Sequence, residues 1–308
     1  EQTKRMVDTF MEKGFTYFDT AYVYIGGKSE VALKEAVVDR YPRDSFQCAT
    51  KLPLWDLKEP QEMEKIFQES LDRAGLEYYD FYLLHAMSAE RVAKADELGA
   101  GDFVQVQINY GDWESPSVQA RKCNAGARKY NKPGIIMAPV RGGSLAIMPP
   151  QVQQVFKEAE PENSVASWAV RYCASLEGIV TVLSGMSTEE QLNDNVSYME
   201  NFQPLNEGER ATVQKVVDIL NSLPTIPCTA CKYCVDGCPQ KINIPGIFKA
   251  MNDLTLYNNE VTARHSYNNA VGEGGKAGDC IQCGACEAHC PQKIEIIETL
   301  KKAAETFA

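Results

Sequence analysis

The strongest constraint on this chain is a cysteine run that occurs twice in its last third. The segment CTACKYCVDGCPQKINI spans residues 228–244, and CIQCGACEAHCPQKIEI spans residues 280–296. Both copies have the spacing C-x2-C-x2-C-x3-C-P and the same CPQKI tail. Buried structural cysteines have no reason to repeat in register. The two runs, which hold eight of the eleven cysteines, are therefore expected to act together.

This spacing is that of the bacterial iron–sulfur run. A tight turn presents the first three thiolates to three corners of a [4Fe-4S] cube. The fourth cysteine, which precedes proline, ligates the other cluster in two-cluster proteins. The pattern therefore predicts two clusters with interleaved ligands, and the two runs must face each other. The first ligand set is Cys228, Cys231, Cys234 and Cys290. The second ligand set is Cys280, Cys283, Cys286 and Cys238.

Two other uses of cysteine compete with this interpretation. Disulfides need a secreted context, and we see no signal peptide, although the sequence does not begin with methionine. Zinc suits sites made of two C-x2-C pairs, not two runs that end in Cys-Pro. The remaining Cys48, Cys123 and Cys173 have apolar neighbours and are expected to be small core residues. Clusters and free thiols favour a reducing cytoplasm.

Charge and hydropathy exclude two classes of partner. The formal net charge is −11, and both nucleic acid and anionic membrane surfaces require a basic face. No apolar run approaches membrane-spanning length, so we expect no membrane association. With 308 residues, the chain is long enough for more than one domain.

Short apolar strands alternate with amphipathic helices up to about residue 201. The strands TYFDTA, FQCATKL and YYDFYLLHAM carry Asp19, Lys51 and His85 at or near their C-terminal ends. Alternation of this kind predicts βα units and a parallel α/β sheet. In barrels of such units, active sites are built at the C-terminal ends of the strands.

The motifs FDTAYVY, ATK and YLLHA resemble those of the aldo-keto reductases, and the cysteine tail resembles their iron–sulfur subgroup. This resemblance implies a (β/α)8 TIM barrel with a catalytic tetrad of Asp19, Tyr24, Lys51 and His85. Tyr22 falls at the wrong position in the motif. The resemblance also implies reduction of a small-molecule carbonyl substrate by NAD(P)H.

The resemblance gives each member of the tetrad a role. Tyr24 donates the proton, and the Lys51 ammonium is expected to lower the tyrosine pKa from its usual value near 10. Asp19 keeps Lys51 charged, and His85 orients the carbonyl. Taken singly, each residue has a structural interpretation: a strand-end cap, a loop aromatic, a solvated lysine or a core histidine.

The resemblance further implies a set of nucleotide contacts. In the family, the residues at the positions of Gln105 and Met137 contact the nicotinamide, and the loop of Arg141, Gly142, Gly143 and Ser144 lies over the pyrophosphate. Ser184, Gly185, Met186, Gln191 and Asn195 match the residues that contact the adenosine phosphate and the adenine. Gln105 is assigned to the nicotinamide carboxamide, with Gln107 as second choice. Met137 stands where many relatives have an aromatic residue, and Gly185 stands where many NADP-binding relatives have lysine. The choice between NADP and NAD is therefore open.

The strand count is two short of eight. His85 ends what resembles the fourth strand, whereas DFVQVQINY resembles the sixth, and the helical-looking AERVAKADELGA lies between them. The first strand is also absent. Because open barrel edges are unfavourable, we expect that this sequence omits segments of a longer chain, at its start and around residues 100/101. The alternative is a trimmed barrel that folds.

We therefore predict a barrel over residues 1–201, a helix and linker over 202–227, and an α-helical two-cluster ferredoxin-like domain over 228–308. In that last domain, Ile247, Met251, Leu254 and Tyr257 recur at helical spacing, and 296–304 forms a closing helix.

Hydride transfer moves two electrons and a cube moves one, so coupling them needs a converter such as FMN. Three functions stay open. In the first, the clusters feed or drain electrons of a nicotinamide-dependent carbonyl reductase. In the second, the protein transfers electrons, and its barrel docks a ferredoxin-like or other redox partner or an unusual substrate. In the third, the protein is a reductase whose clusters are structural.

Overall fold

The computed structural model describes residues 1–308 except 56, 58, 60, 86–100, 116–117 and 273. The described residues divide into two compact units. The first unit contains residues 1–106, 121–137 and 177–203, and the second contains 107–120, 138–176 and 204–308. The domain division at 201 and 228 stays a prediction, and the helix-like segment at 89–100 lies outside the described residues.

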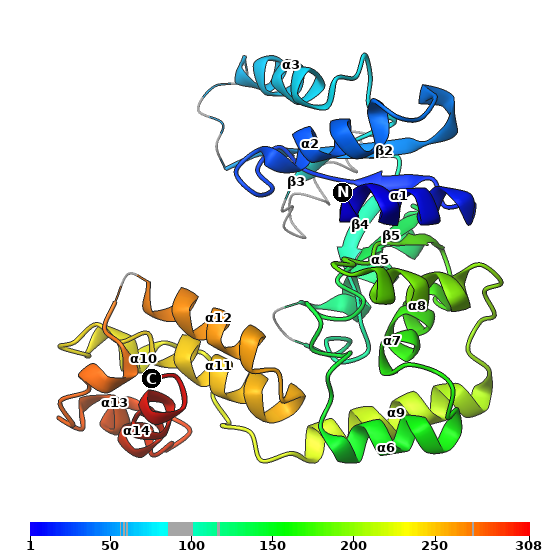
Figure 1. The fold of residues 1–308 in the computed structure, drawn as a ribbon. Helices are drawn as coiled ribbons and strands as arrows, with labels where there is room; N and C mark the ends of the chain where they lie inside the picture. The colour runs from blue at the N-terminus through cyan, green and yellow to red at the C-terminus, as the bar shows by residue number, and fades with distance from the viewer. Residues whose placement is uncertain (56, 58, 60, 86–100, 116–117, 273) are drawn as a thin grey trace. The chain divides into compact units, whose positions relative to one another are not determined.

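The six strands expected from the sequence are all present (Figure 1). In chain order they are β1 (Tyr17–Asp19), β2 (Gln47–Pro53), β3 (Phe81–His85), β4 (Val104–Gln107), β5 (Gly134–Met137) and β6 (Ile179–Val182). They form two three-stranded sheets, with strand orders β1-β2-β3 and β4-β5-β6. The pairs β1/β2, β2/β3 and β5/β6 are parallel, as the alternation of strands and helices predicts.

The described residues do not form the closed eight-stranded barrel that the sequence resemblance implies. The first sheet ends at β1 and β3, and the second ends at β4 and β6. In an eight-stranded barrel of this kind, the missing first strand would pair with β1 and β6. The missing fifth strand would pair with β3 and β4. A sheet without those strands leaves unpaired backbone groups at its edges. That the sequence omits segments of a longer chain stays a prediction.

The helices of the first unit bury one face each. They are α1 (Gln2–Glu12), α2 (Lys28–Leu33) with a π-helical continuation (Lys34–Val38), α3 (Glu62–Ala74), α5 (Ala120–Lys129, whose first residue belongs to the second unit) and α8 (Glu189–Met199). A single 3-10 turn covers Arg43–Ser45. Leu71 and Ala74 of α3 pack with Val37 and Phe46 in the core of this unit. The α3 helix ends at Gly75, whose positive φ of 65° is the left-handed C-cap that glycine favours.

The second unit is helical. It contains α6 (Pro150–Ala159), α7 (Val165–Ala174), α9 (Glu207–Ser222), α10 (Tyr233–Asp236), α11 (Ile244–Tyr257), α12 (Glu260–Val271), a 3-10 turn (Ala277–Asp279), α13 (Ala285–His289) and α14 (Ile296–Thr306). A capping box between Asn206 and Glu209 starts α9. Stacked rings of Phe156 and Trp168, with centroids 4.8 Å apart, fill the core between α6 and α7.

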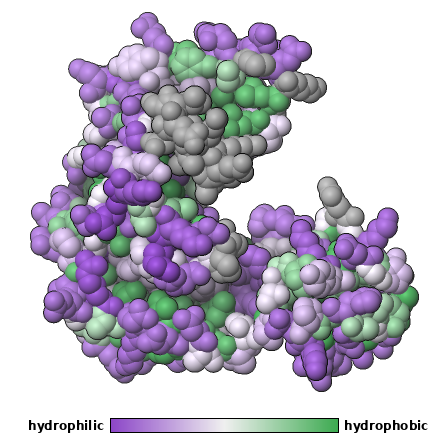
Figure 2. Space-filling model, turned by 180° about the vertical axis from the view of Figure 1, so that it is seen from behind, coloured by the Kyte–Doolittle hydropathy of each residue, from purple (hydrophilic) through white to green (hydrophobic). Residues whose placement is uncertain are grey.

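The insert between the two cysteine runs is helical, as predicted, and it consists of α11 and α12. Both pack in one apolar core with α14, and six of the eight cysteines of the two runs belong to this core or pack against it. Of the three remaining cysteines, Cys48 and Cys173 are buried and Cys123 is half-buried. No helix within the described ranges is long and apolar enough to cross a membrane. Hydrophilic side chains cover much of the face shown in Figure 2.

Candidate active site and cluster cavities

Four polar side chains of the first unit meet where its first sheet ends. Asp19 ends β1, Lys51 lies in β2 and His85 ends β3. The parallel pairing of these strands therefore places the three residues on neighbouring strands of one sheet. The Lys51 Nζ donates hydrogen bonds to Asp19 Oδ2 and to the Thr20 carbonyl oxygen, each at 2.6 Å. The same Nζ lies 4.9 Å from the centroid of the Tyr24 ring. The Tyr24 and His85 rings meet edge to face, with centroids 5.6 Å apart.

The neighbouring tyrosine, Tyr22, has different partners. Its hydroxyl donates a hydrogen bond to Glu69 Oε2 at 2.6 Å, and the Arg73 guanidinium lies 4.1 Å from the centroid of its ring. Both partners belong to α3. The tyrosine whose ring adjoins Lys51 and His85 is therefore Tyr24.

Burial dominates the electrostatics of these groups. It raises the pKa of the Asp19 carboxyl and lowers that of the Lys51 ammonium, and the attraction between the two opposes both shifts. Burial, and then the charge of Lys51, lower the pKa of His85, so this imidazole is neutral at pH 7.

The expectation that Lys51 lowers the pKa of Tyr24 is wrong for this arrangement. Burial raises the pKa of the Tyr24 phenol, and the negative charge of Asp19 raises it further. The reason is geometric, because the Lys51 ammonium is directed at Asp19 and the Thr20 carbonyl and lies beside the Tyr24 ring. At neutral pH the Tyr24 phenol therefore keeps its proton.

An aromatic side chain that the sequence analysis missed borders this group. The Trp55 ring lies with its centroid 5.0 Å from that of His85, and 55% of its surface is exposed. The only signal in the sequence was its position just after the strand that carries Lys51. A large, half-exposed aromatic ring beside His85 offers an apolar wall to a bound molecule.

The two residues assigned to the nicotinamide lie together on adjacent strands. The Gln105 Nε2 on β4 is 3.8 Å from the Met137 Sδ on β5. Gln105 also lies close enough to Asp19 to lower its pKa, against the larger effect of burial. Among the described residues, Gln105 Oε1 and His85 Nδ1 are buried without a hydrogen-bond partner. Buried polar atoms of this kind call for a ligand or water. Gln107, the second choice, instead contacts Asp112.

The residues assigned to the adenosine end gather at the start of α8. Asn195 Nδ2 donates to Ser184 Oγ at 2.7 Å, and Gln191 Oε1 accepts from the Ser187 amide at 2.7 Å. Thr188 caps this helix by accepting a hydrogen bond from the Gln191 amide. Met186 lies half-buried in the same loop. The start of a helix of this length favours an anion such as a phosphate.

Gly185 sits in this loop with open space around it, because a Cβ at this position would meet no heavy atom within 4 Å. If a nucleotide binds here, Gly185→Lys should raise the affinity for NADPH relative to NADH by about tenfold, the value of one charge-assisted hydrogen bond to the 2′-phosphate. Titration of the two nucleotides by fluorescence measures this ratio. Gly185→Met has similar length without the charge, and an equal shift in that variant would contradict the prediction.

The loop assigned to the pyrophosphate lies in the second unit and is tightly turned. Arg141, Gly142 and Gly143 have φ values of 51°, 63° and 89°. The amides of Arg141, Gly143 and Ser144 donate to carbonyl oxygens within the loop or just before it, at 3.0–3.2 Å. Ser144 is buried. The Arg141 guanidinium forms ion pairs with Asp112 and Asp253. In this arrangement the three loop amides and the Arg141 guanidinium all bond to groups of the protein.

Two cavities lie in the C-terminal part of the second unit. The thiols that line the first are those of Cys228, Cys231, Cys234 and Cys290. The thiols that line the second are those of Cys238, Cys280, Cys283 and Cys286. Each cavity thus takes three cysteines from one run and the fourth from the other, which is the interleaving that the spacing predicts.

The backbone of the two runs repeats along with the cysteines. Residues with positive φ recur at equivalent positions of the two copies. The pairs are Ala230 and Gln282, Lys232 and Gly284, and Lys241 and Lys293, with φ between 51° and 77°. Non-glycine residues rarely adopt this conformation, and such strain concentrates at functional sites. The two runs therefore turn their cysteines inward in the same way.

The donor set and the space fit an iron–sulfur cube better than a single ion. Within the described part of the chain, no three Cys, His, Asp or Glu side chains are arranged to hold one metal ion. Four thiols spread around a hollow instead suit a cluster of several atoms. Apolar side chains complete the walls, with Ile244 lining both cavities and Phe248 the first.

Comparison with known proteins gives two family matches. The model of the aldo/keto reductase family matches residues 1–91 and 86–218, and that of a 4Fe-4S dicluster domain matches residues 227–295. Aflatoxin B1 aldehyde reductase member 2 from Rattus norvegicus is 30% identical over 118 residues, which are 35% of this chain and 32% of that protein. The match thus spans about a third of that relative.

Solved structures show the same fold at low identity. An aldo-keto reductase from Bacillus halodurans in its holo form has a TM-score of 0.55 and 20% identity, over 69% of this chain and 86% of that one. A glycerol dehydrogenase from Gluconobacter oxydans has a TM-score of 0.56 and 16% identity, over 73% and 88%. An aldo-keto reductase from Klebsiella pneumoniae in complex with NADPH has a TM-score of 0.54 and 17% identity, over 70% and 84%.

Proposed function

This chain belongs to the aldo/keto reductase family, and we propose that it reduces a carbonyl-type substrate with NAD(P)H while two [4Fe-4S] clusters transfer electrons. One observation carries the first half of the proposal. Asp19, Tyr24, Lys51 and His85 form one connected group at the ends of three neighbouring parallel strands. Strand ends of this kind are where barrel enzymes place their chemistry.

Each residue of the group has a definite task in such a reduction. A bound NAD(P)H supplies the hydride. Tyr24 donates a proton to the carbonyl oxygen, and its phenol is protonated at neutral pH because burial and Asp19 raise its pKa. The ion pair between Asp19 and Lys51 fixes a cation beside that phenol. Neutral His85 has Nδ1 free of any partner among the described residues, so it can hydrogen-bond and orient the substrate.

The second half of the proposal rests on the two thiol-lined cavities. Each offers four cysteines in the interleaved pattern of a two-cluster protein, within walls that are largely apolar. A path between nicotinamide and clusters needs a group that accepts two electrons and passes them on singly. FMN is the group that we propose to test for, by measuring flavin released when the purified protein is denatured.

An anaerobic titration tests whether the two halves form one enzyme. NADPH and then NADH are added to the protein with oxidised clusters, and the broad visible absorption of the clusters is followed. Coupled function predicts bleaching by at least one of the nucleotides, to the extent reached with dithionite. If dithionite bleaches the clusters and neither nucleotide does, coupled function is wrong.

One feature favours a second candidate, an electron-transfer protein that meets a redox partner. The side chains of Tyr233 and Ile281 are 62% and 58% exposed, and each adjoins a cysteine of one run. Exposed apolar patches mark sites of protein–protein interaction, and these two side chains adjoin cysteines that would hold the clusters. Reduction of the clusters by a ferredoxin-like donor but not by NADPH or NADH would favour this candidate.

A further inference from the structure

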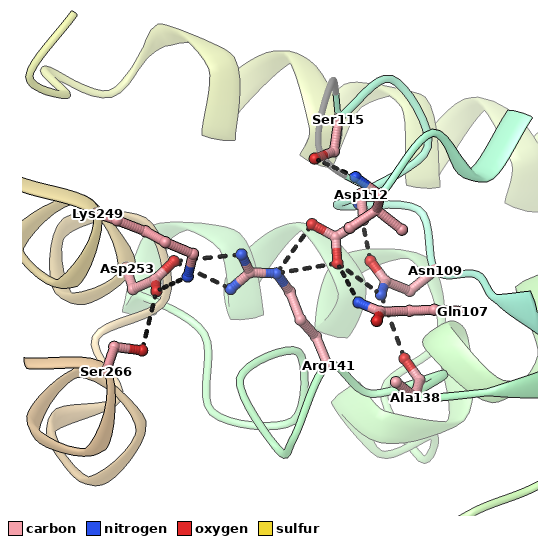
Figure 3. A network of polar contacts seen from close by, with 10 residues as sticks. Gln107, Asn109, Asp112, Ser115, Ala138, Arg141, Lys249, Asp253 and Ser266 are labelled. Carbon is pink, nitrogen blue, oxygen red and sulfur yellow. Dashed lines mark hydrogen bonds and ion pairs between the residues drawn. The ribbon is translucent and has the colours of Figure 1, made fainter. Parts of the chain in front are cut away.

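The Arg141 side chain connects two carboxylates from distant parts of the sequence (Figure 3). Its Nε donates to both carboxylate oxygens of Asp112, at 3.1 and 3.2 Å. Its Nη1 and Nη2 both donate to Asp253 Oδ1, at 3.2 Å each. The exposed fraction of the Arg141 side chain is 18%, and that of each aspartate is 6%. All three nitrogens of the guanidinium are thus used in a largely buried bridge.

The network around each carboxylate is also complete. Asp112 accepts hydrogen bonds from Asn109 Nδ2 at 3.0 Å and from Gln107 Nε2 at 3.4 Å. Asp253 accepts from Lys249 Nζ at 2.7 Å and from Ser266 Oγ at 3.4 Å, so it holds α11 and α12 together. Satisfied networks of this kind fix one arrangement of the segments that contribute to them.

The helix that carries Asp253 also builds the first cluster cavity. Phe248, in the same helix α11, lines that cavity together with the cysteines of the first ligand set. One turn beyond Asp253, the Tyr257 ring lies 4.3 Å from the Arg141 guanidinium carbon. Arg141 therefore contacts α11 through an ion pair and through an aromatic face.

We propose that Arg141 is a positioning residue that fastens α11, and with it the two cysteine runs, to the loop at 138–146. The pyrophosphate of a nucleotide is then held without this side chain, contrary to the sequence resemblance. Removal of the guanidinium would leave two buried carboxylates facing each other, which is strongly unfavourable. The assignment does not depend on the reaction proposed above.

Hydrogen–deuterium exchange on the holo-protein tests the bridge. Arg141→Lys keeps the positive charge but loses the planar fork, and Asp253→Asn removes the charge from the other side. We expect the amides of α11 to exchange at least tenfold faster in each variant. Lys249→Met is the matched control, because Lys249 donates to the other oxygen of the Asp253 carboxylate, Oδ2, while its side chain is 62% exposed, and it should change exchange by less than threefold. Unchanged exchange in Asp253→Asn would overturn the proposal.

NADPH binding to the same variants separates the two roles of Arg141. The dissociation constant should change by less than threefold in both Arg141→Lys and Asp253→Asn. A tenfold or greater loss of affinity in Arg141→Lys would overturn the proposal, whatever the exchange shows, because it would make Arg141 a nucleotide ligand. If the unaltered protein binds neither NADPH nor NADH, the proposed function fails, and the exchange measurement still decides on the bridge.

Discussion

Replacing Cys290 with serine is expected to destroy the cluster held by the first cysteine run, although Cys290 belongs to the second run. Its thiol lines the first cavity, together with Cys228, Cys231 and Cys234. A serine hydroxyl is a poor ligand for iron, so about half of the bound iron and acid-labile sulfide should be lost. Iron and sulfide analysis of the anaerobically purified variant measures this loss.

The pattern of losses across four variants is a sharper test than any single loss. Interleaving predicts that Cys290→Ser and Cys234→Ser leave the same surviving cluster, as judged by the electron paramagnetic resonance spectrum after reduction with dithionite. Cys238→Ser and Cys286→Ser should leave the other one. Cys123→Ser, outside both runs, should retain both clusters. If Cys290→Ser and Cys286→Ser leave the same spectrum, each run holds its own cluster and the interleaving is wrong.

Cysteine spacing could predict how the eight cysteines divide between two cavities because it restricts geometry locally. Three cysteines within seven residues must lie on one turn, and a cysteine followed by proline leaves that turn in another direction. The structure divides the eight thiols between the cavities in the predicted way. The positions of Asp19, Lys51 and His85 were predictable for a similar reason, since the carboxyl ends of parallel strands meet at one edge of a sheet.

Features that depend on side-chain orientation could not be predicted. The direction of the Tyr24 pKa shift depends on where the Lys51 ammonium points, and contacts with Asp19 and the Thr20 carbonyl decide this. No pattern in the sequence encodes those contacts. Trp55 was missed because a single aromatic residue after a strand has no period or partner to mark it.

The bridge that Arg141 forms with Asp112 and Asp253 could not be predicted, for another reason. Local sequence shows only a glycine-containing loop, whereas Asp253 lies 112 residues further along the chain. Partners so distant are brought together by the packing of the whole unit, and no spacing rule connects them. The six strands of the described residues, by contrast, could be predicted, because each is a short apolar run between turn or helix signals.

Replacing Tyr24 with phenylalanine is expected to lower the turnover of a simple aldehyde by roughly 10²–10⁴-fold, which is the usual contribution of a positioned proton donor. The ring and its contact with His85 are kept, and only the proton is lost. Because burial and Asp19 raise the pKa of this phenol, its deprotonation should not limit reduction below pH ~10. Steady-state turnover with NADPH and with NADH, from neutral to alkaline pH, measures both effects.

Tyr22 provides the matched control, because Tyr22→Phe removes a hydroxyl two residues away whose partners, Glu69 and Arg73, both belong to α3. Its turnover should stay within about threefold of the unaltered protein, since a single hydrogen bond outside the site contributes only about 1 kcal/mol to stability. Full turnover in Tyr24→Phe would remove Tyr24 as the proton donor. Loss of turnover in both variants would mean that the turn at 22–27 supports the site, and that the chemistry does not reside in the Tyr24 hydroxyl alone. Cluster reduction by dithionite should be the same in all three proteins, because the cysteine ligands lie in the other unit.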